Sequence, residues 1–293
     1  MSPVSRRTLL LGGVGIAVAG TGTAGYLVND GVLPGRVDAY RILGLNGPSA
    51  PIPTIAPGQQ YDGSFVSLAR GGVRTGWSLT VPPGHEPAGL PLLICLHGAR
   101  ADHGTAFRKM GIDRFLAQAV AQGVAPFVIA TVDGGATSYW HPRADGTDAS
   151  AMVLDELVPM LRRRFALGDG LGLYGWSMGG YGALSMTMRG APVRVTAACS
   201  PALFASFADT ARGSFDDEDS FRLFGLRGQG PDFPHVPVRI DIGEGDPFYF
   251  AVHDFVDSMD PRPAGGFEAG AHEYGYMRRV LPDQLAFVAA HLT

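Results

Sequence analysis

Short, uninterrupted apolar runs alternate with stretches of helical periodicity along most of the chain. The runs cover residues 91–96, 126–132, 170–174, 193–199 and 236–242. The helical stretches cover residues 107–121, 148–164, 179–189 and 281–291. Strands that are apolar on both faces need helices on both faces, and this alternation is typical of a parallel sheet with crossover helices. The pattern therefore predicts an α/β fold with a mostly parallel central sheet.

The segment before the first run has a different pattern. Residues 63–70 and 75–81 alternate between apolar and polar side chains and are joined by a pair of glycines, which predicts an antiparallel hairpin. No repeat or linker divides the chain after it. We therefore expect one domain over residues 61–293, preceded by an irregular lead-in over residues 31–60. The Gly-, Pro- and Asp-rich residues 204–235 are expected to cross the edge of the sheet, and a lid is one interpretation of them.

The composition excludes several classes of protein. Hydrophobic residues make up 46% of the chain and charged residues 17%, so the chain can bury enough apolar surface to fold. The formal net charge of -4 argues against a nucleic-acid partner. No cysteines and histidines have the spacing of a zinc site, and His97 and His103 lack a third ligand. We therefore expect no metal and no cofactor.

The first 30 residues have the layout of an export signal. Arg6 and Arg7 are followed by an uncharged, Gly- and Ala-rich stretch over residues 8–28. This pattern is typical of a twin-arginine signal at residues 1–30. The alternative is an uncleaved anchor, since about 20 apolar residues can span a bilayer. Both interpretations predict a folded chain outside the cytoplasm: secreted, periplasmic, or associated with the membrane or cell envelope through its N-terminus.

The two cysteines, Cys95 and Cys199, lie in apolar runs that are expected to be buried strands. An oxidising compartment would permit a bridge between them. However, a disulfide needs Cα atoms within about 7 Å, a distance that strands which are not neighbours exceed. We favour two buried thiols that pack as small hydrophobic side chains.

One motif carries the chemistry of a nucleophile. Gly175-Trp176-Ser177-Met178-Gly179 lies between an expected strand and an expected helix, which is the setting of a nucleophile elbow. The glycines are needed because the turn leaves no room for side chains beside the serine. The turn also brings the hydroxyl to the N-terminus of a helix, whose partial positive charge favours a developing anion.

A nucleophilic serine needs a base, and the base needs an acid that orients it. In this architecture the acid and then the histidine follow the serine along the chain. His272 lies in a loop before the last helical stretch, whereas His253 and His291 lie in helical spacing. Asp246 lies on the loop past the last apolar run, and Glu244, two residues earlier, is the alternative acid. The expected relay therefore runs from the serine to His272 to Asp246.

Two backbone N–H groups are also needed to bind the oxyanion of the tetrahedral intermediate. One is expected from Met178, the residue after the serine. The other is expected from Ala99, because Gly98 permits a turn directly after the run that ends at residue 96.

Four further residues are candidates for substrate binding: Arg100, His97, Trp140 and Tyr274. His97 lies beside the oxyanion turn and is expected to shape it in preference to transferring protons. Trp140 either walls the substrate pocket or packs over the edge of the sheet. Tyr274 flanks the candidate base and is expected to shield it from water or to pack structurally.

These motifs resemble those of the α/β-hydrolase superfamily. More narrowly, they resemble the putative-esterase group, which includes esterase D (S-formylglutathione hydrolase) and the secreted mycolyltransferases of mycobacteria. The resemblance covers most of the chain after residue 63, and its most specific segments are residues 96–101, 133–140, 175–180 and 270–276. It implies an α/β-hydrolase fold in a single domain. It also implies site residues: Ser177 as nucleophile, Asp246 as acid, His272 as base, and Ala99 and Met178 as oxyanion donors.

Two positions depart from the mycolyltransferase pattern. Arg100 matches an arginine that contacts sugar hydroxyls in those enzymes, whereas His97 stands where they have an aspartate with the same role. Their acid is a glutamate, so Asp246 is more similar to the esterase D pattern.

The sequence thus predicts an exported serine hydrolase that cleaves small-molecule or lipid carboxylic esters through an acyl-serine intermediate. An acyltransferase that moves a fatty acyl group to a sugar or another alcohol is the alternative within the same chemistry. A non-catalytic cell-wall-binding relative is the alternative from another class. The complete set of serine, acid and histidine argues against that last alternative.

Overall fold

The computed structural model describes residues 35–292. Residues 35–45 belong to one compact unit and residues 46–292 to another. The expected export signal at residues 1–30 lies outside the described residues.

The first unit contains the short helix α2 (Arg36–Ile42). An ion pair of 2.6 Å between Arg41 and Asp38, one turn apart, supports it. The expectation of an irregular lead-in is wrong for this stretch, because a helix of seven residues is too short to show a hydrophobic period. Residues 47–59 contain no helix or strand, as expected.

The larger unit is built on one sheet of eight strands. In chain order the strands are β1 (Gln60–Ser67), β2 (Val73–Thr80), β3 (Leu92–Leu96), β4 (Val128–Val132), β5 (Leu171–Trp176), β6 (Val195–Cys199), β7 (Val238–Gly243) and β8 (Ala264–Glu268). Their order across the sheet is β1-β2-β4-β3-β5-β6-β7-β8. β1 and β2 pair antiparallel, as do β2 and β4, and all other neighbours are parallel. The expected fold class is confirmed.

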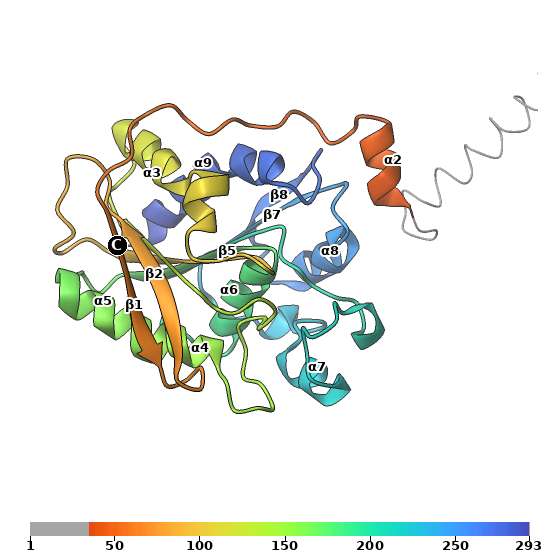
Figure 1. Cartoon of the computed structure of the whole chain (residues 1–293). Helices are drawn as coiled ribbons and strands as arrows, with labels where there is room; N and C mark the ends of the chain where they lie inside the picture. The colour runs from red at the N-terminus through yellow and green to blue at the C-terminus, as the bar shows by residue number, and fades with distance from the viewer. Residues whose placement is uncertain (1–34, 293) are drawn as a thin grey trace, which may run out of the picture. The chain divides into compact units, whose positions relative to one another are not determined.

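Helices cover both faces of this sheet (Figure 1). The helices on one face are α4 (Ala149–Ala151), the π-helix η2 (Met152–Leu157), α5 (Val158–Phe165), α6 (Met178–Met188) and α8 (Tyr249–Ser258). Those on the other face are the π-helix η1 (Ala106–Met110), α3 (Ile112–Ala121) and α9 (Tyr274–Leu292). Each face of the sheet has its own hydrophobic core. Along β3, Leu92 and Ile94 pack into the core on the α6 face, and Leu93 packs into the core on the α9 face. Burial on both faces explains why the strands are continuous apolar runs.

Several expected boundaries differ from the structure. The helix expected over residues 107–121 is divided into η1 and α3 at Gly111, which has a φ of 69°. An added Cβ at Gly111 would lie 2.4 Å from the Ile52 side chain. The last helix begins at Tyr274, and Pro282 lies inside it, although the pattern places the start beside this proline. The apolar pattern does not predict β8, which is a mostly exposed strand of sequence Ala-Gly-Gly-Phe-Glu.

Residues 204–235 connect the neighbouring strands β6 and β7 and pack against α6, and their interpretation as a lid stays a prediction. They contain two short 3-10 turns, η3 (Phe207–Asp209) and η4 (Gly230–Asp232), and the helix α7 (Glu218–Phe224). The Tyr181 hydroxyl of α6 donates to the Phe224 carbonyl at 2.5 Å, and the Arg189 guanidinium donates to the Leu223 carbonyl at 2.9 Å. The segment therefore adds a further layer outside α6.

The two thiols are free and buried. Cys95 lies in β3 and Cys199 in β6, and β5 runs between these strands. Burial raises the pKa of both thiols above the ordinary value, so neither is a reactive thiolate.

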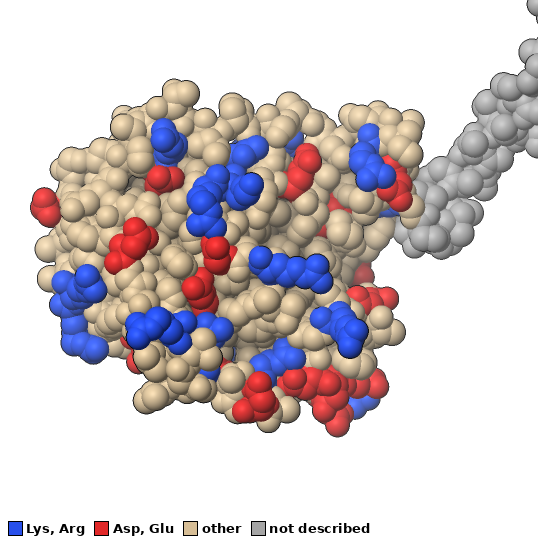
Figure 2. All heavy atoms as spheres, viewed as in Figure 1, with Lys and Arg blue, Asp and Glu red and all other residues tan. Residues whose placement is uncertain are grey.

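Charges of both signs are interspersed on the face of the molecule in Figure 2, and acidic side chains gather over α7. This face therefore has no continuous basic surface of the kind that a nucleic-acid backbone requires. Within residues 35–292, none of the helices combines the length and the apolar character that a membrane crossing needs.

Candidate active site

The motif around Ser177 forms a sharp turn between β5 and α6. Ser177 has φ 56° and ψ −123°, a conformation that a non-glycine residue rarely adopts. An added Cβ at Gly175 would lie 2.1 Å from the Gly179 carbonyl oxygen, and one at Gly179 would lie 1.9 Å from the Leu96 carbonyl oxygen. Only glycine fits at both positions. The turn therefore presents the Ser177 hydroxyl at the carboxyl edge of the sheet, at the N-terminus of an 11-residue helix.

His272 lies between this hydroxyl and a buried carboxylate. Its Nε2 is 2.9 Å from Ser177 Oγ, and its Nδ1 is 2.7 Å from Asp246 Oδ2. Because an ionised carboxylate only accepts hydrogen bonds, the Nδ1–H donates to Asp246 and Nε2 is left to accept the serine proton. The other carboxylate oxygen accepts the Phe248 backbone N–H at 2.9 Å. The three side chains form one continuous hydrogen-bonded relay.

Parallel strands bring these three side chains together although they are far apart in sequence. Ser177 follows β5, Asp246 lies on the loop after β7, and His272 lies on the loop after β8, so all three are at the carboxyl edge of the sheet. Asp246 is 1% exposed, whereas 26% of the His272 side chain is exposed. The acid is therefore shielded from water and the base can be reached by a substrate.

The alternative acid, Glu244, has a different place in the fold. Its backbone N–H donates to the Glu268 carbonyl at 2.8 Å and so prolongs the pairing of β7 with β8. The next residue, Gly245, donates in the same way to Gly270 at 2.8 Å. The structure brings the carboxylate of Asp246, and not that of Glu244, to the imidazole.

Two backbone N–H groups are available where the oxyanion is expected. Met178 is the first residue of α6, a position whose N–H has no partner within a helix. Ala99 follows Gly98, where an added Cβ would lie 3.2 Å from Ser177 Cβ, so this loop passes directly beside the serine. Among the residues that the structure describes, none accepts a hydrogen bond from the N–H of Ala99 or Met178.

His97 holds the oxyanion loop in place. Its Nε2 accepts the Gly134 backbone N–H at 2.9 Å, and its Nδ1 lies 2.8 Å from the Gly98 carbonyl oxygen, to which it donates. Its ring packs edge-on against Trp140, and the Trp140 indole N–H donates to the His97 carbonyl at 3.3 Å. His97 is 2% exposed and Trp140 is fully buried. Because both side chains lie in the core behind the loop, the structure favours a positioning role over substrate contact for His97, and structural packing over a pocket wall for Trp140.

The other two candidate binding residues remain at the surface of the site. Arg100 is exposed, with a φ of 59°, and its backbone N–H donates to the Ala136 carbonyl at 2.8 Å. Tyr274 begins α9 two residues after the base and is half-buried. Burial raises the pKa of the Tyr274 hydroxyl, and its hydrogen bond with Trp176 opposes this, so the hydroxyl stays neutral near pH 7.

Phe248 belongs to the site although the sequence patterns do not single it out. Its backbone N–H binds Asp246, and its ring lies edge-on to the His272 ring with centroids 5.3 Å apart. The signal that could have identified it is its position two residues after the acid, where an aspartate commonly accepts the backbone N–H of a turn.

No group of three or more metal-ligating side chains occurs among residues 35–292.

The burial of His97 has a consequence for stability at low pH. Burial lowers the pKa of His97, and protonation would oppose a second N–H to the Gly134 N–H. The unfolded chain takes up this proton near pH 6.5, whereas the folded chain resists it, so the unfolded state binds more protons below that pH. We expect the free energy of unfolding to fall as pH drops below about 6.5, by up to about 1.4 kcal/mol per pH unit for this one group.

Urea unfolding of the intact chain and of His97→Gln, from neutral pH to about pH 5, measures this effect. All other ionisable groups are the same in both proteins, so the difference between the two slopes isolates His97. Equal slopes in the two proteins would contradict the assignment of a neutral, buried imidazole.

The comparisons with known proteins agree with this fold. The sequence profile of the family described as putative esterase matches residues 72–260. The comparison with curated proteins gives no match.

Three similar solved structures are an esterase and two hydrolases by their titles. A ferulic acid esterase has a TM-score of 0.68 and 17% identity, covering 79% of this chain and 98% of that chain. The Staphylococcus aureus fluorophosphonate-binding serine hydrolase F has a TM-score of 0.65 and 18% identity, with 80% and 99% coverage. An S-formylglutathione hydrolase from Agrobacterium tumefaciens has a TM-score of 0.66 and 18% identity, with 84% and 100% coverage. At these identities the similarity concerns the fold.

Proposed function

The chain belongs to the putative esterase family and is a carboxylesterase-type hydrolase, and we propose that it cleaves carboxylic esters outside the cytoplasm through an acyl-Ser177 intermediate. One observation carries the proposal. The distances of 2.9 Å from Ser177 Oγ to His272 Nε2 and of 2.7 Å from His272 Nδ1 to Asp246 Oδ2 form an unbroken path for a proton.

In the first half of the reaction, Ser177 Oγ attacks the ester carbonyl carbon while His272 Nε2 takes its proton. Negative charge moves to the carbonyl oxygen, where the N–H groups of Ala99 and Met178 bind it, and each such donor is worth about 100- to 1,000-fold in rate. The tetrahedral intermediate collapses with cleavage of the carbon–oxygen bond. His272 gives its proton to the departing alkoxide, which leaves as the alcohol.

In the second half, water attacks the acyl-serine carbonyl and gives a proton to His272. The second tetrahedral intermediate then releases the carboxylic acid, and the proton returns to Ser177 Oγ. Asp246 keeps the imidazole in the tautomer that can accept a proton and stabilises the imidazolium that forms in each half.

The proposed substrates are small-molecule or lipid esters. The titles of the similar structures name ferulic acid esterases and S-formylglutathione hydrolases. An exported chain would not meet a cytosolic thiol ester, so an oxygen ester of the extracellular space or cell envelope is the better fit.

Acyl transfer is a second candidate function, because a polar hollow lies beside the oxyanion loop. Its volume is about 300 Å³, and Ser138, Arg143 and Thr147 are among its lining residues. Residues 134–138 also line it, and they are hydrogen-bonded to the oxyanion loop, because the Arg100 backbone N–H donates to the Ala136 carbonyl at 2.8 Å. Such a hollow could hold the hydroxyls of a sugar that accepts the acyl group in place of water.

Product analysis distinguishes these functions. We expect the purified full-length chain to convert p-nitrophenyl butyrate into p-nitrophenol and butyric acid, detected by mass spectrometry, with or without trehalose. Butyryl-trehalose as the main product would instead support the transferase. If p-nitrophenol is not released, the chain is a binding protein and the proposal fails.

The proposed route of export is the twin-arginine pathway. Its support is the pair Arg6-Arg7 before an uncharged stretch. Replacing both arginines by lysine should leave the chain in the cytoplasm, as seen by cell fractionation. Unchanged export of that variant would contradict the route.

A further inference from the structure

An apolar pocket of about 260 Å³ lies between α6, the segment after β6 and α8. The aromatic and aliphatic side chains that line it include Leu203, Phe204, Phe215, Phe221, Leu226 and Phe255. The ring centroids of Phe215 and Phe221 are 5.1 Å apart, and those of Phe204 and Phe215 are 6.4 Å apart, so the rings form one connected wall. We call this cavity the α6–α8 pocket.

Three segments that line the α6–α8 pocket lie close in the chain or by backbone hydrogen bonds to residues of the catalytic relay. On α6, the lining residue Tyr181 donates its backbone N–H to the Ser177 carbonyl at 3.0 Å. The second wall starts from Ala202, whose backbone N–H donates to the same carbonyl at 3.0 Å, and Leu203 follows directly. The third wall, α8, starts three residues after Asp246. Two lining segments are therefore tied to the backbone of the nucleophile by hydrogen bonds of 3.0 Å.

An aromatic pair separates the pocket from the imidazole. Phe204 lines the pocket and packs edge-on against Phe248, with centroids 5.6 Å apart. Phe248 in turn packs edge-on against His272. An acyl group that extends from Ser177 Oγ into the pocket would leave the imidazole free to carry protons.

Charge is confined to the outer rim of the pocket. Arg227 and Asp254 are exposed lining residues, whereas Leu203, Phe215 and Phe255 are buried. Between Ala251 and Ser258 the pocket follows α8 for about 10 Å, at a rise of about 1.5 Å per residue. A cavity of this length with buried apolar walls favours a ligand portion that is itself apolar and longer than an acetyl group.

We infer that the α6–α8 pocket binds the acyl half of the ester, and that this acyl group is hydrophobic and larger than acetyl. The inference rests on the proposed function, because it assumes that Ser177 is acylated. Each methylene buried in such a pocket is worth about 0.8 kcal/mol, which is about fourfold in kcat/KM. Four extra methylenes therefore predict a preference on the order of 100-fold for a hexanoyl over an acetyl ester.

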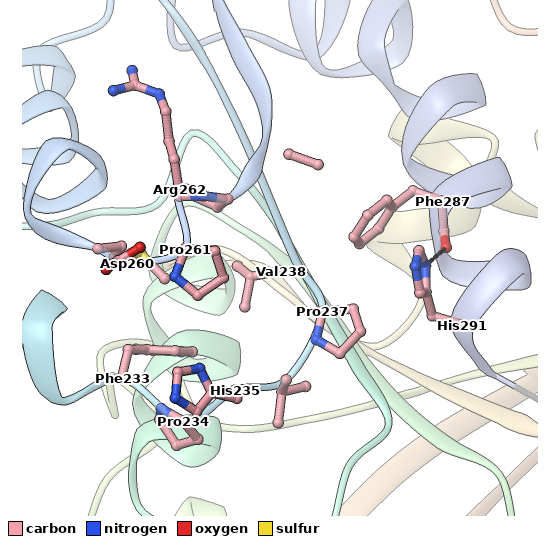
Figure 3. Close-up of a pocket in the computed structure, with 14 residues that line it drawn as sticks. Phe233, Pro234, His235, Pro237, Val238, Asp260, Pro261, Arg262, Phe287 and His291 are labelled. Carbon is pink, nitrogen blue, oxygen red and sulfur yellow. Dashed lines mark hydrogen bonds between the residues drawn. The ribbon is translucent and has the colours of Figure 1, made fainter.

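A larger hollow, of about 350 Å³, lies at the amino ends of β7 and β8, and Figure 3 shows the residues that line it. It is lined by residues before β7, by residues 259–264 and by Phe287 and His291 of α9. β7 runs from Val238 at this hollow to Gly243 near the relay, a length of about 17 Å at about 3.3 Å per residue. This hollow is too far from Ser177 to hold the acyl group and provides a matched control.

The test measures kcat/KM for p-nitrophenyl acetate, hexanoate and 3-phenylpropionate. In Ala251→Trp, an indole added on α8 fills the α6–α8 pocket, and in Ala205→Trp the indole closes it from an exposed position that cannot disturb the core. The control Ala264→Trp adds the same bulk to the hollow of Figure 3. We expect both pocket variants to lower the ratio of kcat/KM for hexanoate to that for acetate at least about tenfold. The control should keep the wild-type ratio.

The outcomes separate the two proposals. A preference for either large acyl group over acetate, lost in both pocket variants and kept in the control, supports the acyl pocket. Hydrolysis of all three esters with ratios that no pocket variant changes would overturn the acyl pocket and leave the proposed function standing. Failure to hydrolyse even the acetate ester would overturn the proposed function itself.

Discussion

Replacing Ser177 by alanine should lower kcat for p-nitrophenyl ester hydrolysis on the order of a million-fold, because the covalent route disappears with the hydroxyl. The N–H groups of Ala99 and Met178 would remain, so a slow reaction above the rate in water is expected to persist. Ser177 is partly exposed at the start of α6, and the loss of one oxygen atom leaves no large cavity. Fold and stability should therefore change little, and thermal unfolding checks this.

Ser64→Ala is a matched control for this experiment. Ser64 is an exposed residue of β1, paired with Gly76 in the hairpin and remote from the relay. Steady-state kinetics should give wild-type kcat for this variant. Activity of Ser177→Ala within about tenfold of the wild type would mean that a different group is the nucleophile.

Replacing Asp246 by asparagine should lower kcat by about 10,000-fold with little change in structure. The asparagine side chain has nearly the same shape, but its amide N–H can donate where the carboxylate only accepts. The imidazole would then turn its lone pair toward residue 246 and its N–H toward Ser177, and Nε2 could not take the serine proton. Because Asp246 is 1% exposed, bulk water would not restore the lost acceptor.

The companion variant Glu244→Gln carries the same chemical change two residues earlier. The backbone of residue 244 takes part in the β7–β8 pairing, and the imidazole of His272 binds Asp246. The substitution changes neither contact, so we expect kcat within a fewfold of the wild type. The pair is measured side by side, with circular dichroism to confirm folding. An inactive Glu244→Gln beside an active Asp246→Asn would assign the acid to Glu244.

The nucleophile turn is predictable from sequence because its causes are local. A buried strand must be apolar on both faces, a tight turn needs glycines, and α6, which follows the turn from Met178, has its own periodicity. The candidate acid and base are predictable in order because carboxyl ends of parallel strands share one edge of the sheet. Residues 171–188 illustrate this, since their expected strand, turn and helix all occur in the structure.

Other features have no local cause. β8 supports the loop of His272, but its exposed Gly265 and Gly266 lack the apolar run that marks the inner strands. The role of His97 depends on Gly134 and Trp140, which reach it from the loop after β4. A histidine beside the oxyanion turn has the same sequence signature whether it faces substrate or core. Only the packing of distant segments decides between these two roles.

The most direct test of the central claim is the mass of the protein after reaction with a fluorophosphonate, which traps an activated serine as a stable ester. Intact-mass measurement followed by peptide mapping should find one adduct, on Ser177. The adduct should be absent in Ser177→Ala and should form much more slowly in His272→Ala. An adduct on another residue, or ester hydrolysis by a chain that takes up no label, would contradict the account.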